Sequence, residues 1–325
     1  MEKLFKMNIA VTGANGYIGK LLVEKLRKQG YNITILVRSK SSFAVNKKIK
    51  VIYGDLTDNQ FDFESFLNGC DVIVNCAANL FDESKMFDLH VSSSIKLYNR
   101  LSEIKKKENK IAKWIQISSV GSYGTLNSYS SEYKIVDEKF NCNPINTYEL
   151  SKFVFDEFLL KNNISNTSIN SIILRPSNIF GPNMKNASLR NLVNSIKKGH
   201  FFYVGNKNSI LTYVHEDDVV NAIDLCVKHQ GASGIYNLSQ NCTLQDLVNE
   251  IGFPKYLPLI KIPEKFVRML VRNKIFKLFI GEKLTEKRLN SLVNKCSYSS
   301  LRIMDELDFN FEESILFQLK FYSTK

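Results

Sequence analysis

Residues 11–19 read Val-Thr-Gly-Ala-Asn-Gly-Tyr-Ile-Gly, and this stretch decides the fold of the chain. It continues a short apolar segment, 8–11, and leads into an amphipathic segment, 17–29, that ends at Gly30. Gly-x-x-Gly-x-x-Gly between a strand and a helix is typical of a dinucleotide-binding loop, because the glycines allow a tight turn and a close approach to the pyrophosphate. The phosphates then face the positive N-terminus of the helix.

The rest of the first half alternates short segments rich in Val and Ile with amphipathic ones. Buried strands are expected at 8–11, 33–37, 51–53, 72–76, 114–117 and 171–174. Helices are expected between them, at 17–29, about 84–107 and 153–161. This alternation implies right-handed crossovers, and so predicts an α/β fold with a doubly wound parallel-sheet Rossmann domain.

Tyr148 and Lys152 are one helical turn apart, so their side chains share a face. An ammonium group beside a phenol favours the phenolate, and is expected to lower the pKa of Tyr148. Tyr148 then exchanges a proton with a hydroxyl group while a hydride moves to or from a nicotinamide. Ser119 ends the preceding strand, where parallel sheets bind ligands, and is expected to hydrogen-bond the substrate oxygen. Ser119, Tyr148 and Lys152 are therefore the predicted catalytic residues.

The residues that follow the second strand, Val37-Arg38-Ser39-Lys40, include no acid for the ribose hydroxyls of NAD. Arg38, with Ser39 or Lys40, is expected to pair with a 2′-phosphate, which favours NADP; NAD and a merely solvated basic loop are the alternatives. Asp55, after the third strand, is expected to accept a hydrogen bond from the adenine amino group. Small residues at 76–78 allow the cofactor to lie flat over the sheet edge.

Composition narrows the class of partner and the compartment. The 325 residues include 44 Lys and Arg against 32 Asp and Glu, a net charge of +12 that suits an anionic partner. The lysines are dispersed and no nucleic-acid motif is present, so a phosphorylated small molecule is favoured over nucleic acid. Six cysteines without a Cys-x-x-Cys pair and only four histidines predict reduced thiols and no metal site. No apolar run approaches the ~20 residues that span a bilayer, so no transmembrane segment is expected. The first strand begins too early to leave room for a signal peptide, so a cytoplasmic protein is expected.

These segments together resemble the extended short-chain dehydrogenases/reductases, the NAD-dependent epimerase/dehydratase family, over essentially the full length. The matching segments are 12–19, 54–56, 75–78, 118–119 with 123–124, 148–152, 174–178 with 181–182, and 213–215 with 217–218. The resemblance implies that residues 175–178 form a loop that touches nicotinamide and substrate. The predicted cofactor-binding residues are then Gly13, Asn15, Gly16, Tyr17, Ile18, Gly19, Arg38, Asp55, Leu56, Cys76, Ala77, Ala78, Tyr148, Lys152, Arg175, Pro176 and Asn178.

The resemblance also implies a discontinuous cofactor domain. It comprises residues 1–181 and about 211–240, and a smaller, mostly helical substrate domain comprises about 182–210 and 241–325. A homodimer is expected by the same analogy.

Three departures from the family pattern bear on the reaction. Val120 and Gly121 stand where 4,6-dehydratases typically carry an Asp-Glu pair, so dehydration is not expected. Leu211 stands where epimerases often carry an arginine, and His90 where relatives often carry an asparagine. The leading expectation is an NADP-dependent oxidoreductase that reduces a 4-keto nucleotide sugar. A nucleotide-sugar 4-epimerase, a reductase of a steroid-like or flavonoid-like ketone and a non-catalytic dinucleotide sensor are the alternatives.

Overall fold

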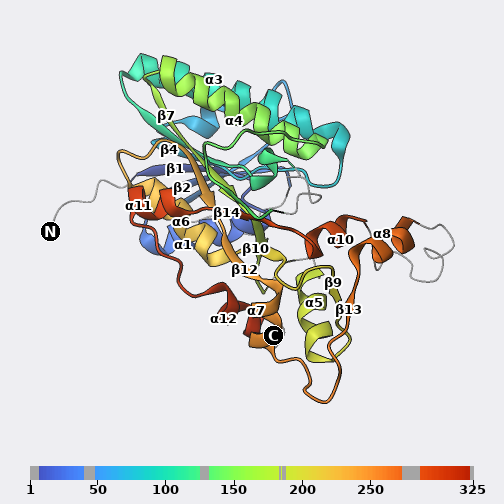
Figure 1. Ribbon diagram of the computed structural model, residues 1–325. Coiled ribbons are helices and arrows are strands. Elements are labelled where there is room, and N and C mark those ends of the chain that lie inside the picture. The colour runs from blue at the N-terminus through green and yellow to red at the C-terminus, as the bar shows by residue number, and fades with distance from the viewer. Residues whose placement is uncertain are drawn as a thin grey trace.

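A seven-stranded parallel sheet forms the centre of the protein (Figure 1). The computed structural model describes residues 7–39, 48–124, 132–182, 184, 188–272 and 286–322, except for the side chains of residues 287 and 288. The strand order is β11-β7-β5-β4-β1-β2-β3. The strands are β1 (Asn8–Thr12), β2 (Asn32–Val37), β3 (Ile49–Tyr53), β4 (Val72–Asn75), β5 (Ala112–Ile117), β7 (Ile169–Pro176) and β11 (Gly234–Leu238).

Helices cover both faces of this sheet (Figure 1). One face packs against α1 (Tyr17–Gln29), α6 (Glu216–Lys228) and α11 (Leu301–Leu307), and the other against α2 (Phe63–Leu67), α3 (Ser94–Glu108) and α4 (Thr147–Ser165). Each face has its own apolar core, so the inner strands are buried on both sides, which explains their high Val and Ile content. The predicted α/β, doubly wound fold is confirmed.

Helix α1 has the bounds that the sequence predicts. Ile18, Leu22 and Leu26 are buried at four-residue spacing and place one stripe of the helix against the sheet. Gly30 ends the helix with a φ of 88°, and its N–H group bonds to the last carbonyl groups of the helix. Only a residue without a Cβ adopts this left-handed conformation at little cost.

The predicted helix at 84–107 begins less regularly than its sequence suggests. A 3₁₀ turn, η1 (Glu83–Lys85), comes first, followed by a π-helical turn, η2 (Asp88–Ser93), and only then by α3. A π turn inserts one extra residue per turn, so it shifts the direction of the side chains that it carries. His90 lies within this turn.

Smaller sheets lie beside the main one and are built mostly from the second half of the chain. One of them has three strands in the order β12-β10-β8. The other two are separate two-stranded sheets, β13-β9 and β14-β6. These strands are β6 (Lys134–Val136), β8 (Asn178–Phe180), β9 (Tyr203–Val204), β10 (Ile210–His215), β12 (Gln240–Thr243), β13 (Lys261–Ile262) and β14 (Cys296–Tyr298). The remaining helices of the described residues are η3 (Val120–Tyr123), α5 (Ser188–Lys197), α7 (Leu244–Ile251), α8 (Glu264–Arg272), α10 (Glu286–Leu292) and α12 (Ile315–Phe321).

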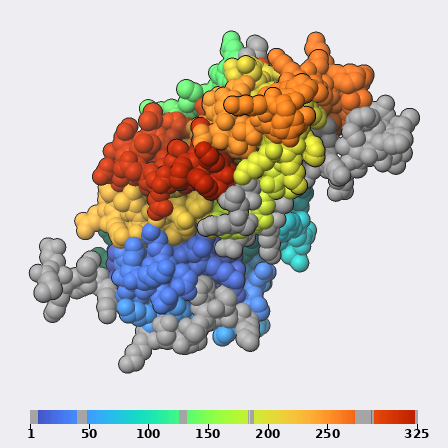
Figure 2. Space-filling model, turned by 90° about the horizontal axis from the view of Figure 1, so that it is seen from below, coloured from blue at the N-terminus to red at the C-terminus, as the bar shows by residue number. Residues whose placement is uncertain are grey.

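The C-terminal segment links the two halves. Helix α11 packs next to β11 of the main sheet, and α12 packs next to α7 and β12 of the smaller part. Figure 2 shows this segment in red, between the orange residues of the smaller part and the golden and blue residues of the larger one. No helix among the described residues is long and apolar enough to cross a membrane.

Candidate active site

The glycine loop is tightly packed between β1, α1 and the loop that follows β4. Gly13 has a φ of +65°, and a Cβ atom there would lie 2.7 Å from the backbone of Cys76 and Ala77. A Cβ at Gly19 would lie 2.2 Å from the Gly13 carbonyl oxygen. A larger residue at Gly13 would therefore push apart the two loops that end β1 and β4, and one at Gly19 would push α1 away from the glycine loop.

The N-terminus of α1 is suited to a phosphate group. Gly16 occupies the N-cap and supplies no capping side chain, and the first turn contains no acidic residue. The N–H groups of Tyr17 and Ile18 therefore lie at a positive helix end without a side-chain acceptor from the cap. The buried Tyr17 hydroxyl also has no hydrogen-bond partner in the structure. These features fit the pyrophosphate of a dinucleotide; the Ile18 side chain is buried in the core and offers only its backbone.

Arg38 and Asp55 lie together at the ends of β2 and β3. The Arg38 side chain is 80% exposed and its guanidinium is 3.9 Å from the Asp55 carboxylate. The other Asp55 oxygen accepts hydrogen bonds from the backbone N–H and hydroxyl of Thr57. The Leu56 side chain is buried in the core. Lys40, which was predicted to assist Arg38, lies outside the described residues.

A row of buried polar side chains, which the sequence reasoning missed, crosses the sheet beneath the site. The Thr12 hydroxyl donates to Asn75 Oδ1 at 2.6 Å, and Asn75 Nδ2 donates to Gln116 Oε1 at 2.9 Å. The Thr12 hydroxyl also accepts from the backbone N–H of Ala77 at 3.2 Å. The row joins the ends of β1, β4 and β5, and so fixes the loop 76–78 that was predicted to face the cofactor.

The structure brings the three predicted catalytic residues together. Ser119 caps η3, where its hydroxyl accepts from the Gly121 N–H at 3.0 Å, and the same hydroxyl lies close enough to Tyr148 to lower the pKa of the phenol. Lys152 Nζ lies 6.0 Å from the centre of the Tyr148 ring and donates to the Ile117 carbonyl oxygen at 2.9 Å. Helix α4 can begin just before Tyr148 because the side chain at position 146 caps its first turn.

The predicted lowering of the Tyr148 pKa is wrong for this arrangement. Burial raises the pKa of Tyr148 to about 12, and the nearby Ser119 hydroxyl only partly opposes this. Lys152 does not offset the burial because its ammonium is directed to the Ile117 carbonyl and not to the phenol oxygen. Burial also lowers the pKa of Lys152 to about 8, against the opposing effect of Asp156.

Arg175 was predicted to touch the cofactor or substrate, but its side chain lies inside the protein. Its side chain is 1% exposed, and its Nε donates to Asp156 Oδ2 at 2.9 Å. The guanidinium carbon lies 4.7 Å from the centre of the Tyr123 ring, and Ser118 donates to the same Asp156 oxygen at 2.7 Å. An interior arginine of this kind braces α4 against β7. Asp156 was missed, although it lies one turn beyond Lys152.

The other residues of the predicted loop differ in exposure. The Pro176 side chain is buried at the end of β7, whereas Asn178 is exposed on β8 and donates to the Thr212 carbonyl oxygen at 3.1 Å. Val120 and Gly121 lie in η3 directly after Ser119, so that no acid stands there. Leu211 is 4% exposed and belongs to the apolar core of the smaller part.

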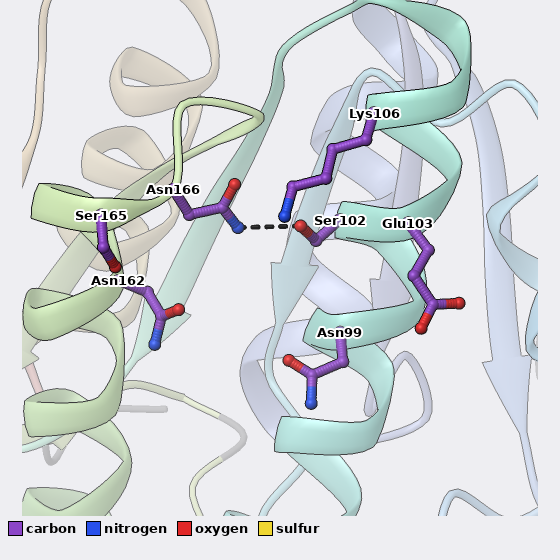
Figure 3. Close-up of a pocket in the computed structure, with 7 residues that line it drawn as sticks. All are labelled: Asn99, Ser102, Glu103, Lys106, Asn162, Ser165 and Asn166. Carbon is purple, nitrogen blue, oxygen red and sulfur yellow. Dashed lines mark hydrogen bonds between the residues drawn. The ribbon is translucent and has the colours of Figure 1, made fainter.

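A separate polar pocket lies between α3 and α4 (Figure 3). It is lined by Asn99, Ser102, Glu103, Lys106, Asn162, Ser165 and Asn166. The Asn166 amide donates to the Ser102 hydroxyl at 2.8 Å across it. On α4 the pocket begins ten residues beyond Lys152, which is about 15 Å along the helix axis. It is therefore not part of the site around Tyr148.

With this geometry in place, comparison with known proteins identifies the class. The family model described as "NAD dependent epimerase/dehydratase family" matches residues 9–239. This range covers more than half of the chain and includes the glycine loop and all three predicted catalytic residues. The chain belongs to the NAD-dependent epimerase/dehydratase family.

Individual relatives carry out different reactions. The chain is 24% identical to the decarboxylating sterol-4-alpha-carboxylate 3-dehydrogenase of Dictyostelium discoideum, over 73% of each protein. It is 26% identical to the UDP-glucose 4-epimerase of Vibrio cholerae, over 81% of the chain and 80% of the relative. The Thermotoga maritima UDP-glucose 4-epimerase, solved with UDP-glucose, superposes with a TM-score of 0.68 at 19% identity over 98% of each chain. Solved neighbours contain NAD or NADPH.

Proposed function

We propose that the protein is an NADP-dependent oxidoreductase that reduces a keto group on a nucleotide sugar. The observation that carries the proposal is that Ser119 and Lys152 both lie beside Tyr148, Ser119 just after β5 and Lys152 one turn further along α4. This group lies at the carboxyl end of β5, and the glycine loop follows β1 at the same edge of the sheet. Parallel sheets bind ligands at this edge.

The residues divide the work of a carbonyl reduction. A bound nicotinamide supplies the hydride. Ser119 holds the substrate oxygen, and Tyr148 donates its phenolic proton to that oxygen as negative charge develops there. The Lys152 ammonium, 6.0 Å from the centre of the Tyr148 ring, bonds to the Ile117 carbonyl at rest, and we infer that it turns toward the phenol oxygen once the phenolate forms.

Tyr148 is protonated at neutral pH, which is the form that a reduction needs at its start. A phenol with a pKa of about 12 is protonated at neutral pH, so it begins the cycle able to donate a proton. A reaction that starts with the oxidation of a hydroxyl group would instead require Tyr148 to begin as the phenolate.

The positive charges of the protein support a particular cofactor and class of substrate. The exposed guanidinium of Arg38, at the end of β2, is placed to meet a ribose 2′-phosphate, which supports NADP. The net charge of +12 suits a substrate with a diphosphate group. Several relatives are named for reactions of nucleotide sugars, which supports that substrate class.

A nucleotide-sugar 4-epimerase is the second candidate. It is favoured by the likeness to UDP-glucose 4-epimerases in sequence and fold. An epimerase returns the hydride to the substrate and turns over many times on one cofactor, whereas a reductase consumes one NADPH for each product. NADPH consumption measured against product formation separates the two.

The experiment that tests the proposal compares Tyr148→Phe with Tyr123→Phe on a panel of 4-keto nucleotide sugars. Tyr123 is a matched control because it is a buried tyrosine close to the site, whose hydroxyl bonds to Asn237 at 2.8 Å. Loss of the Tyr148 hydroxyl is expected to lower turnover about 10²–10⁴-fold, the usual contribution of a general acid. The Tyr123 variant is expected to keep turnover within a few-fold. Unchanged turnover in Tyr148→Phe would refute the role of this phenol.

A further inference from the structure

The imidazole of His90 connects two segments that are far apart in the sequence. His90 lies in the π turn η2 and is 3% exposed. Its Nε2 accepts a hydrogen bond from the backbone N–H of Asn79 at 2.8 Å, at the end of the loop that follows β4. Its Nδ1 lies 2.8 Å from the Ser151 hydroxyl on α4. A single ring therefore bridges the predicted cofactor loop and the helix that carries Tyr148.

The direction of each hydrogen bond in this bridge is determined by its partners. A backbone N–H can only donate, so Nε2 of His90 carries a lone pair and the ring proton resides on Nδ1. Nδ1–H then donates to the Ser151 hydroxyl, which in turn donates to the Tyr148 carbonyl oxygen at 2.8 Å. The ring is neutral in this arrangement, and burial together with Lys152 lowers the pKa of His90 to about 3.

His90 also contacts the ring of Tyr148 directly. The two ring centres are 5.9 Å apart and the ring planes meet at 84°, an edge-to-face arrangement. At the other end of the bridge, the Asn79 side chain accepts from the backbone N–H groups of Phe81 and Asp82, both at 3.0 Å. The bridge thus starts in an ordered turn and ends at the backbone and ring of Tyr148.

We propose that His90 is a positioning residue that sets the distance between the cofactor loop 76–79 and the Tyr148 phenol. The inference rests on the proposed function, because it assigns that loop to the cofactor and the phenol to proton transfer. His90 touches neither reacting atom in this role. It acts by fixing the turn of α4 from Tyr148 to Ser151 against the loop, and misplacement of a catalytic group by about 1 Å costs on the order of 10²-fold in rate.

Kinetic variants separate positioning from folding. His90→Phe keeps a flat ring against Tyr148 but removes both hydrogen bonds, and is expected to lower kcat about 10–100-fold with KM and NADPH affinity within about threefold. Ser151→Ala cuts the same bridge and is expected to lower kcat similarly, with no further loss in the double variant. Ser102→Ala is the matched control, since it removes another buried hydroxyl, hydrogen-bonded to Ser168 and Asn166, at the pocket of Figure 3.

Partial rescue gives a second kinetic test. Asparagine places its amide nitrogen near the position of Nδ1, and glutamine places its carbonyl oxygen near that of Nε2. His90→Asn is therefore expected to keep the bond to Ser151, His90→Gln the bond to Asn79, and both to be faster than His90→Phe. Wild-type kcat in His90→Phe, a loss expressed only in KM, or additive losses in the double variant with Ser151→Ala would each overturn the proposal.

A spectroscopic arm does not depend on turnover. The chain has four histidines, so ¹⁵N NMR of the imidazole nitrogens in the full-length protein can be assigned by single variants. At neutral pH His90 is expected to show a protonated Nδ1 and an unprotonated Nε2, and Ser151→Ala to shift the Nδ1 signal. The opposite tautomer would overturn the proposal. The two proposals fail on different results. If NMR shows the bridge but the wild-type protein reduces no substrate, the proposed function fails and the positioning role of His90 fails with it. If the protein is active but NMR shows the opposite tautomer, only the positioning role fails.

Discussion

Replacement of Asp156 by asparagine tests the buried charge pair that lies under the candidate site. Asp156 is fully buried on α4, and it accepts from Arg175 at 2.9 Å and from Ser118 at 2.7 Å. Asparagine keeps the size of the side chain but leaves the Arg175 cation without a counter-charge in the interior.

The magnitude follows from burial and chain length. Removal of one partner from a buried ion pair costs about 3–5 kcal/mol. The entropy of unfolding is about 2.1 cal/mol/K per residue, which gives roughly 0.7 kcal/mol/K for 325 residues. The melting temperature of Asp156→Asn is therefore expected to fall by about 4–7 °C.

Differential scanning calorimetry measures this change, with Glu157→Gln as the matched control. Glu157 is the next residue on α4 and its side chain is exposed, so its loss is expected to change the melting temperature by less than about 1 °C. A fall of less than 2 °C in Asp156→Asn, or equal falls in the two variants, would refute the reasoning that the Arg175–Asp156 pair supports the site.

Two further variants probe the cofactor end and the lysine. Arg38→Ala is expected to weaken NADPH binding about tenfold or more and NADH binding less than twofold, as measured by fluorescence titration, because only NADPH offers a 2′-phosphate to the guanidinium; equal losses would contradict the preference for NADP. Lys152→Met is expected to abolish turnover yet raise the melting temperature at pH 7 by about 3 °C. The pKa of Lys152 in the folded protein is about 8, below the ordinary 10.5, so below pH 8 the buried ammonium lowers the stability of the fold by about 3 kcal/mol. Its hydrogen bond to Ile117 contributes about 1 kcal/mol, which leaves a net gain of about 2 kcal/mol for the variant. This gain is expected to fade as the pH rises from 8 to 10.5, and a gain that does not change with pH would contradict the burial argument.

Much of the fold was predictable because it depends on local patterns. The strands of the main sheet contain short apolar runs, and α1 has a clear apolar stripe between a glycine loop and a terminal glycine. Strand β11 was not predicted. It is a short apolar segment far along the chain from the other strands of the main sheet, and nothing in its own sequence assigns it to that sheet. The π turn was also missed, because its extra residue leaves no period in the sequence.

The candidate site was predictable where motif and chemistry coincide, and not where partners are distant. Ser119, Tyr148 and Lys152 are brought together as expected. The direction of the Arg175 side chain depends on Asp156, which the motif does not include. The pKa of Tyr148 depends on burial and on where the Lys152 ammonium is directed, and neither follows from the spacing of the two residues.

The most direct test of the account is the single-turnover rate of hydride transfer from bound NADPH to a 4-keto nucleotide sugar in Tyr148→Phe. The account predicts that NADPH binds the variant within about twofold of its normal affinity, while hydride transfer slows by at least about 10²-fold. Hydride transfer at the wild-type rate in the variant would contradict proton donation by this phenol.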